Sequence, residues 1–373
     1  MMTCAVTTSF LGCLATTYLF VRYALYLDFS CWQKGLIWLG FLLIGCFPLF
    51  VSYHFESVFG RFYPYWRYGL YFFFVGAIIL LTLTLVVDAG WFISRLISRL
   101  QGKEMLLCGM SRQACLWMNA GVVFVALLCA FWALYEGVKI PVIKNTEILS
   151  DKIQTEQKIV VLSDIHIHRV INPTKVKGIV EQTNVQNPDI ILLAGDIIDD
   201  DVEKVSEITA LLKDLKAKKG VFFVTGNHDF YAGYKPTVNA MNNLGFSFLE
   251  NDGVSLGEVY LAGVPDTFSG KSFGKKADIK QAFANANEGQ YKILMSHTPT
   301  EFAEDKVFDL EISGHTHGGQ IFPFHIFAKL HNRYLAGLYK MESGADIYVS
   351  RGAGQWGPQM RFLAPSEISV ITL

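Results

Sequence analysis

Cysteine is missing from the second part of this 373-residue chain, because all seven cysteines precede residue 137. They are Cys4, Cys13, Cys31, Cys46, Cys108, Cys115 and Cys129. None of them forms a CxxC pair, and we interpret them as small apolar residues of membrane helices. The second part therefore has no disulfide, which fits either side of a membrane.

Several functional signatures are also missing. The chain has no GxxxxGK[ST] phosphate-binding loop and no GxSxG motif, so neither a nucleoside-triphosphate motor nor a serine hydrolase is supported. The formal net charge is −1 and the second part carries no basic stripe, so no nucleic-acid partner is expected. No basic residue precedes the first apolar run, which argues against a cleavable signal peptide.

Charged residues are scarce in four long runs before residue 137. The runs lie near Thr3 to Leu27, Trp32 to Tyr53, Trp66 to Val87 and Ala114 to Tyr135. Each is close to the roughly 20 residues that a membrane helix needs, and none shows the polar face of a buried soluble helix. The sequence therefore predicts that residues 1–136 form an all-α transmembrane domain of four helices, followed by a second domain over residues 137–373.

Loop charge predicts the orientation of these helices. The connection between the third and fourth runs carries Arg95, Arg99, Lys103 and Arg112, which exceed its acidic residues. The positive-inside rule places this connection in the cytoplasm. The fourth helix then runs outward, so we expect a multi-pass protein of the cell membrane with the second domain on the outer face.

The second part begins with patterns that are typical of an α/β fold. Gly137 to Lys144 alternates and contains a proline, which predicts an edge strand. Further strands are predicted at Lys158 to Asp164, Ile190 to Ala194, Val221 to Thr225, Tyr291 to Ser296 and Asp309 to Ser313, and helices at Pro173 to Gln186, Val202 to Lys218 and Pro236 to Leu244. Strands that alternate with helices indicate a largely parallel core, and short strands after Gly245 indicate a second sheet.

Polar side chains follow the predicted strands at the end where open α/β sheets bind ligands. The first strand ends in Asp164 and His166, and residues two apart in an extended segment point the same way. The later strand ends carry Asp196 and Asp199, then Asn227, His228 and Asp229, then His297, then His315 and His317. A pair of divalent metals about 3.5 to 4 Å apart needs a bridging carboxylate, for which Asp196 is the natural candidate. Oxygen and imidazole ligands suit Mn, Fe or Zn.

This ordered set resembles the calcineurin-like metallophosphoesterases over roughly Gly137 to Leu373. The resemblance implies an α/β fold, a four-layer α/β/β/α sandwich. It also implies that Asp164, His166, Asp196 and His317 bind one metal, while Asp196, Asn227, His297 and His315 bind the other. The GHTHGGQ stretch at 314–320 is similar to that of membrane-anchored bacterial phosphodiesterase-like proteins.

The resemblance also suggests catalytic roles. His228 occupies the position of the imidazole that contacts the phosphate and protonates the leaving oxygen. Asp229 is expected either to orient that ring or to cap a turn, and Asp199 either to support the site or to be a surface carboxylate. Arg351 is expected to bind substrate or to form a structural pair. Gln320 and Arg361 are each expected either to bind a second phosphate or an acidic lipid headgroup, or to form structural pairs. His168 is expected either to touch substrate or to be a solvated loop residue, whereas His325 and His331 are expected to have packing or surface roles.

The leading interpretation is a membrane-anchored phosphohydrolase with two metal ions. It would cleave a phosphomonoester or phosphodiester of a small molecule or lipid near the bilayer by metal-activated hydroxide. One alternative is a UDP-diacylglucosamine-type nucleotide-sugar lipid pyrophosphatase, which needs the site on the cytoplasmic face. An alternative of another class is a membrane sensor or scaffold with a non-catalytic domain, whose signature would be missing metal ligands. The sequence leaves the oligomeric state open.

Overall fold

The computed structural model describes residues 2–25, 27–46, 59–101, 111–299, 302 and 304–373. The chain divides into two compact units. One comprises Met1–Leu134 with Pro358–Met360, and the other comprises Tyr135–Gly357 with Arg361–Leu373. The first unit is helical, and the second contains all the strands of the described residues.

The helical unit has helices in each of the four apolar runs. They are α1 (Met2–Tyr23), α2 (Cys31–Gly45), α5 (Tyr63–Leu100), which follows the short η1 (Gly60–Phe62), and α6 (Arg112–Val138). By length and composition α5 and α6 are able to cross a membrane, whereas α2 is a shorter apolar helix. Four membrane spans are therefore not established. The end of the second predicted run and Lys103 of the basic connection lie outside the described residues.

Small and polar side chains join the helices of this unit. A Cβ atom on Gly12 would lie 2.5 Å from the carbonyl oxygen of Gly45, so α1 and α2 approach closely because both positions are glycine. Arg22 of α1 forms a 3.2 Å ion pair with Asp88 of α5 and donates a 3.1 Å hydrogen bond to Asn119 of α6. Both charges are thus partnered, as charges in apolar surroundings must be.

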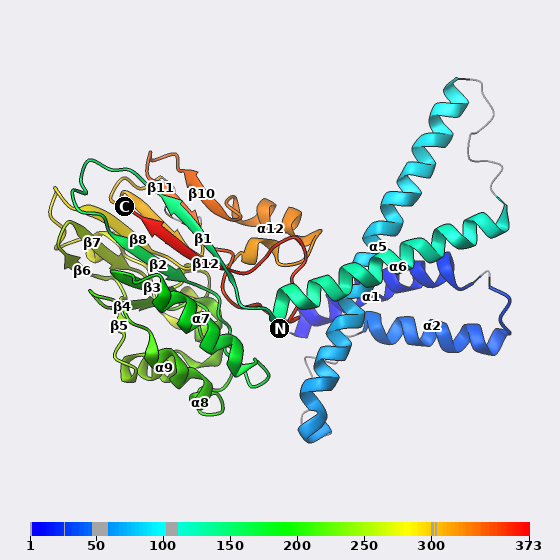
Figure 1. The fold of residues 1–373 in the computed structure, drawn as a ribbon, viewed down its shortest axis with the longest axis horizontal. Coiled ribbons are helices and arrows are strands. Elements are labelled where there is room, and N and C mark those ends of the chain that lie inside the picture. The colour runs from blue at the N-terminus through cyan, green and yellow to red at the C-terminus, as the bar shows by residue number, and fades with distance from the viewer. Residues whose placement is uncertain (1, 26, 47–58, 102–110, 300–301, 303) are drawn as a thin grey trace. The chain divides into compact units, whose positions relative to one another are not determined.

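The first sheet of the second unit has six strands in the order β1-β12-β2-β3-β4-β5 (Figure 1). The strands are β1 (Val142–Glu147), β2 (Lys158–Leu162), β3 (Ile190–Ala194), β4 (Val221–Val224), β5 (Ser247–Phe248) and β12 (Glu367–Thr372). From β2 to β5 all neighbours are parallel, while β12 lies antiparallel to β2 and parallel to β1. The prediction of an edge strand near the start of this unit is confirmed by β1.

The second sheet also has six strands, in the order β10-β11-β9-β8-β7-β6. They are β6 (Asp252–Leu256), β7 (Val259–Gly263), β8 (Tyr291–Met295), β9 (Leu310–Ser313), β10 (Gly337–Lys340) and β11 (Asp346–Val349). The central neighbours are parallel, and the two edge strands pair antiparallel. Both sheets are therefore mixed, and the predicted second sheet is confirmed.

The two sheets face each other across a shared hydrophobic core. Along β3, Leu192 packs with second-sheet residues such as Leu261 and Ile293, whereas Ile191 and Leu193 pack on the opposite side. That opposite side is covered by α7 (Pro173–Val185) and α9 (Asn227–Asn243), and the outer face of the second sheet by the short α11 (Ile279–Ala282) with aromatic loop residues. Because β3 is buried on both faces, its sequence is continuously apolar.

Two helix predictions need correction. The helix predicted at 202–218 is wrong, because only α8 (Ser206–Thr209) and the 3₁₀ turn η2 (Ala210–Asp214) form there. The side chain of Asp201 accepts a 3.1 Å bond from the backbone of Glu203, which favours a turn over a helix at this point. The third helix starts earlier than predicted, at Asn227, and kinks at Gly233, whose φ of 122° accommodates the following proline.

Candidate metal centre

The predicted metal ligands meet at the carboxyl ends of the strands of both sheets. Asp164 and His166 follow β2, Asp196 follows β3, Asn227 begins α9 after β4, His297 follows β8, and His315 and His317 follow β9. His317 opens the 3₁₀ turn η4 (His317–Gly319). The structure therefore brings together all seven predicted ligands, although their metal-binding role stays a prediction.

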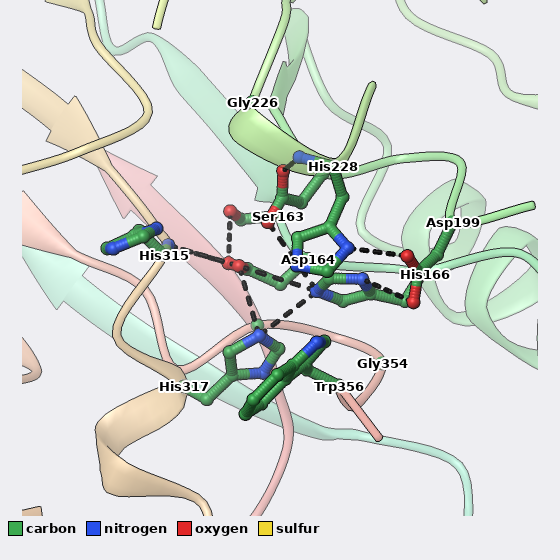
Figure 2. Close-up of polar contacts among 12 residues, drawn as sticks. Ser163, Asp164, His166, Asp199, Gly226, His228, His315, His317, Gly354 and Trp356 are labelled. Carbon is green, nitrogen blue, oxygen red and sulfur yellow. Dashed lines mark hydrogen bonds and ion pairs between the residues drawn. The ribbon is translucent and has the colours of Figure 1, made fainter. Parts of the chain in front are cut away.

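The first group of donors comprises Asp164, His166 and His317 (Figure 2). The Nε2 atom of His317 lies 3.3 Å from Oδ1 of Asp164 and 3.1 Å from Nε2 of His166. All three side chains are buried. Two imidazole nitrogens and a carboxylate oxygen therefore converge on one point, as a metal ion requires.

The second group comprises Asp196, His297 and His315. Nε2 of His297 lies 3.2 Å from Oδ2 of Asp196, and Nδ1 of His315 lies 2.9 Å from Oδ1 of Asn227. The same Oδ2 of Asp196 is 3.7 Å from Nε2 of His166 in the first group. Asp196 therefore lies between the two groups, where a bridging carboxylate is needed.

The backbone at this site is unusual. Five of the seven predicted ligands have left-handed φ values of 50° to 67°, which side-chain-bearing residues rarely adopt. They are Asp164, His166, Asp196, His315 and His317. The sequence-based argument assumed extended segments, so the convergence was predicted correctly but its backbone geometry was not. Strained conformations of this kind cluster at functional sites.

Glycine allows the loops to approach the carboxylates. A Cβ atom on Gly226 would lie 2.2 Å from Oδ1 of Asp196, and one on Gly314 would lie 1.8 Å from Oγ of Ser163. That hydroxyl donates a hydrogen bond to Asp164, which also accepts the backbone N–H of His315. Ser163 was not singled out from the sequence, although its place directly before Asp164 is a signal that could have found it.

The donor atoms fit divalent metal ions. His297 uses Nδ1 to donate a 2.8 Å bond to the carbonyl of Ala194, so Nε2 is the nitrogen that is left to take up a cation, either a proton or a metal ion. This Nε2 is buried and has no hydrogen-bond partner among the described residues, yet it faces the Asp196 carboxylate. Burial lowers the pKa of His297, but the charge of Asp196 outweighs it and holds the pKa well above its usual value. A cation between these two groups satisfies both.

His228 lies beside the metal ligands with a carboxylate partner. Its Nδ1 atom is 2.5 Å from Oδ1 of Asp199, and its backbone N–H donates a 2.7 Å bond to Asp196. Burial lowers the pKa of His228, but the hydrogen bond to Asp199 and the charges of both aspartates raise it to about 9. These carboxylates favour the protonated ring, which is the form that a general acid needs.

Asp229 takes the capping role, which was one of the two roles expected for it. Its Oδ1 accepts the backbone N–H groups of Ile197 and Ile198, and its Oδ2 accepts that of Gly226. The carboxylate beside the His228 ring is Asp199, which also lies 3.5 Å from Nδ1 of His166. Asp229 thus fixes the loops after β3 and β4 to each other. Its assignment as a catalytic residue stays a prediction without a described contact to the ring.

The arginines near the site are structurally engaged. Arg361 is completely buried and donates to the carbonyls of Gly354, His317 and Ala364, which supports a structural role for it. Arg351 forms a 3.1 Å ion pair with Glu367 while its side chain stays one-third exposed. Its substrate-binding role is a prediction that this geometry permits.

The remaining polar candidates differ in their surroundings. Gln320 holds the backbone of Trp356 through two hydrogen bonds, of 2.8 and 3.0 Å. Trp356 places its ring 6.2 Å from that of His228, and no sequence signal indicated this tryptophan (Figure 2). His168 is buried, so its interpretation as a solvated loop residue is wrong, whereas His331 is exposed as expected. His325 stacks on Phe322, with the ring centroids 4.9 Å apart.

The sequence of this chain is similar to those of known proteins. Residues 157–319 match the family model described as calcineurin-like phosphoesterase. A Helicobacter pylori protein described as an uncharacterized metallophosphoesterase is 42% identical over 254 residues, which cover 67% of this chain and 69% of that protein. A Campylobacter jejuni protein with the same description is 32% identical over 288 residues, or 76% of each chain. A Danio rerio protein described as a transmembrane protein with metallophosphoesterase domain is 29% identical over 329 residues, 83% of this chain and 74% of that one.

The chain therefore belongs to the calcineurin-like metallophosphoesterase family, and it is a metal-dependent phosphoester hydrolase. The family resemblance found in the motifs is confirmed. Members of the family use a dinuclear centre of divalent metals, for which the donors described above are the candidates. The narrower assignment to the GHTHGGQ subgroup stays a prediction.

Replacement of Gly226 by alanine is expected to lower metal content. The added Cβ atom would meet Asp196 at 2.2 Å, so either the carboxylate or the loop after β4 must shift. Elemental analysis of the purified protein measures the effect. Gly289→Ala is the matched control, because a Cβ atom there meets nothing within 4 Å. Equal metal content in both variants would contradict the tight fit around Asp196.

Proposed function

We propose that the chain is a membrane-anchored phosphohydrolase with two divalent metal ions, Mn, Fe or Zn, acting on a phosphomonoester or phosphodiester near a bilayer. The observation that carries the proposal is the position of Asp196, which belongs to one donor group and lies 3.7 Å from His166 of the other. In this proposal residues 1–136 anchor the protein and residues 137–373 carry the catalytic site. The length and composition of α5 and α6, together with the description of the Danio rerio relative, support the anchor.

In the proposed mechanism, bound metal ions would supply Lewis acidity and activate water at the phosphorus. The chain's own residues hold and orient the reactants. Asp164, His166 and His317 would hold one ion, and Asn227, His297 and His315 the other, with Asp196 between them. His228, oriented by Asp199, contacts the phosphate and gives a proton from its ring to the leaving oxygen. No covalent bond between enzyme and substrate is needed.

Arg351 is proposed to bind a phosphate oxygen of the substrate. One of its nitrogens is paired with Glu367, which fixes the position of the guanidinium group. A guanidinium has five N–H donors, so this pairing leaves others for an anion. The alternative of a non-catalytic sensor or scaffold is not favoured, because none of the seven predicted ligands is missing.

The proposed dinuclear centre predicts about two metal ions per chain after loading with Mn²⁺. Asp196→Asn should reduce occupancy of both sites together, because the shared negative charge is lost. Elemental analysis and hydrolysis of p-nitrophenyl phosphate by the full-length protein measure this. Asp151→Asn, at an exposed position outside the site, is the control. A stoichiometry of one or none in the unaltered protein would refute the dinuclear centre.

The proposed acid role predicts that His228→Ala keeps its metals but loses turnover, by roughly 10² to 10⁴ for substrates with poor leaving groups. The loss should shrink for nitrophenyl esters, because nitrophenolate leaves without a proton. Steady-state rates for an alkyl and a nitrophenyl ester make the comparison, and His331→Ala at an exposed position is the control. Equal losses for both esters would assign His228 to phosphate binding alone.

The proposed topology places the site outside the cytoplasm, on the basis of Arg95, Arg99, Lys103 and Arg112. A phosphatase reporter fused after Leu373, active only outside the cytoplasm, should therefore be active, and protease added to intact spheroplasts should remove the domain. A reporter that is active only in the cytoplasm serves as the control fusion. If the domain is protected until the membrane is permeabilised, the site is cytoplasmic. In that case the nucleotide-sugar lipid pyrophosphatase is the better-supported hypothesis for the function of the site.

A further inference from the structure

Helix α12 (Phe324–Asn332) exposes its large apolar side chains and buries a polar one, the reverse of an ordinary surface helix. Its large apolar residues, Phe324, Ile326, Phe327 and Leu330, are exposed by 45% to 79%. At 100° per residue they occupy one arc of roughly 160°, and the two phenylalanine rings lie 6.5 Å apart. A surface helix normally turns its apolar arc to the core. Here, Asn332 is the one buried residue of α12, so the apolar arc faces outward.

The helix is attached directly to the metal loop. A Cβ atom on Gly319 would lie 2.2 Å from the Cα atom of His325, so the backbone of α12 packs on η4. His317, a candidate ligand of the first metal, belongs to that same turn. The position of α12 is therefore fixed relative to the metal centre, and its apolar arc is directed away from the core of the second unit.

Further exposed apolar side chains connect this arc with the catalytic residues. Ile321, just before α12, forms a β-bridge with Phe362, and the neighbouring Leu363 is 70% exposed. Figure 1 shows the loop before β12 passing beside α12. Trp356 of the same loop is 56% exposed and lies against His228. Exposed apolar side chains therefore occur both beside His228 and next to the strand bridge that precedes the helix.

We propose that α12 inserts its apolar arc into the surface of a bilayer and that the substrate is a lipid whose phosphoester lies at headgroup level. The inference rests on the function proposed above and adds the class of substrate to it. Amphipathic helices at an interface bury their apolar face about 5 to 10 Å into the boundary between headgroups and acyl chains. A turn packed directly on such a helix lies at the depth of lipid phosphates, while the acyl chains stay in the membrane.

The connectivity of the chain favours a bilayer as the partner of the apolar arc of α12. Residues 139–141 separate the end of α6 from the start of β1, and this connection spans at most about 14 Å. If α6 crosses a membrane, the second unit therefore begins at the membrane surface. The exposed Lys329, at the edge of the apolar arc, suits anionic lipid headgroups.

The test uses the full-length, Mn-loaded protein in phosphatidylcholine vesicles. The vesicles contain either phosphatidic acid, a monoester, or phosphatidylglycerol, a diester; p-nitrophenyl phosphate and bis(p-nitrophenyl) phosphate are the matching soluble substrates. We compare the unaltered protein with Phe324→Ser/Phe327→Ser/Leu330→Ser. The variant should hydrolyse the lipid about tenfold or more slowly, because three apolar side chains no longer enter the bilayer, while hydrolysis of the soluble ester stays unchanged. Leu149→Ser/Val185→Ser, which removes exposed apolar side chains elsewhere, should change neither rate.

The other possible outcomes distinguish failure of the lipid inference from failure of the proposed function. If the unaltered protein cleaves soluble esters but neither lipid, the inference is overturned and the proposed function stands. If it cleaves no substrate at all, the proposed function itself fails. Unchanged lipid hydrolysis by the triple variant would also overturn the inference. If the triple variant then changes its oligomeric state, α12 is instead an interface between two copies of the chain.

Discussion

The buried charge of Asp196 is the constraint on which the site depends. This carboxylate follows β3, which is covered on both faces, and burial raises its pKa. The charges of His297, His228 and His166 outweigh burial and hold the pKa well below its usual value. His297 comes from the second sheet and the other two from the first. An isolated buried carboxylate is costly, so the two sheets must pack together for this anion to be tolerated.

Much of the fold and of the site could be predicted from the sequence. Strands such as β3 are continuous apolar runs, and the ligands are the polar residues that end them. The contacts that could not be predicted are those that depend on the direction in which the backbone turns after a strand. Asp229 follows His228 directly in the sequence, whereas Asp199 comes from the loop after β3. The sequence pattern does not say which of the two carboxylates reaches the His228 ring, and the structure shows that it is Asp199. Trp356 reaches the site only through tertiary contacts, which leave no local pattern.

Hydrogen bonds between neighbouring loops hold the left-handed backbone conformations of the predicted ligands. The backbone N–H of Asp164 donates to Gly195, and that of His166 donates to Asp196, so the loops after β2 and β3 continue the pairing of their strands. A left-handed conformation costs about 1 to 3 kcal/mol at each residue, which these bonds help to offset. These bonds between the two loops hold Asp164, His166 and Asp196 in the positions from which their donor atoms converge.

The position of β1 bears on how the protein is made. This strand directly follows α6, yet its neighbour in the sheet is β12, the last of the described strands to leave the ribosome. The backbone edge of β1 and the adjoining edge of β2 stay unpaired until β12 is synthesised and inserted between them. These edges therefore stay unpaired during most of the synthesis of the second unit, a period in which open strand edges favour aggregation.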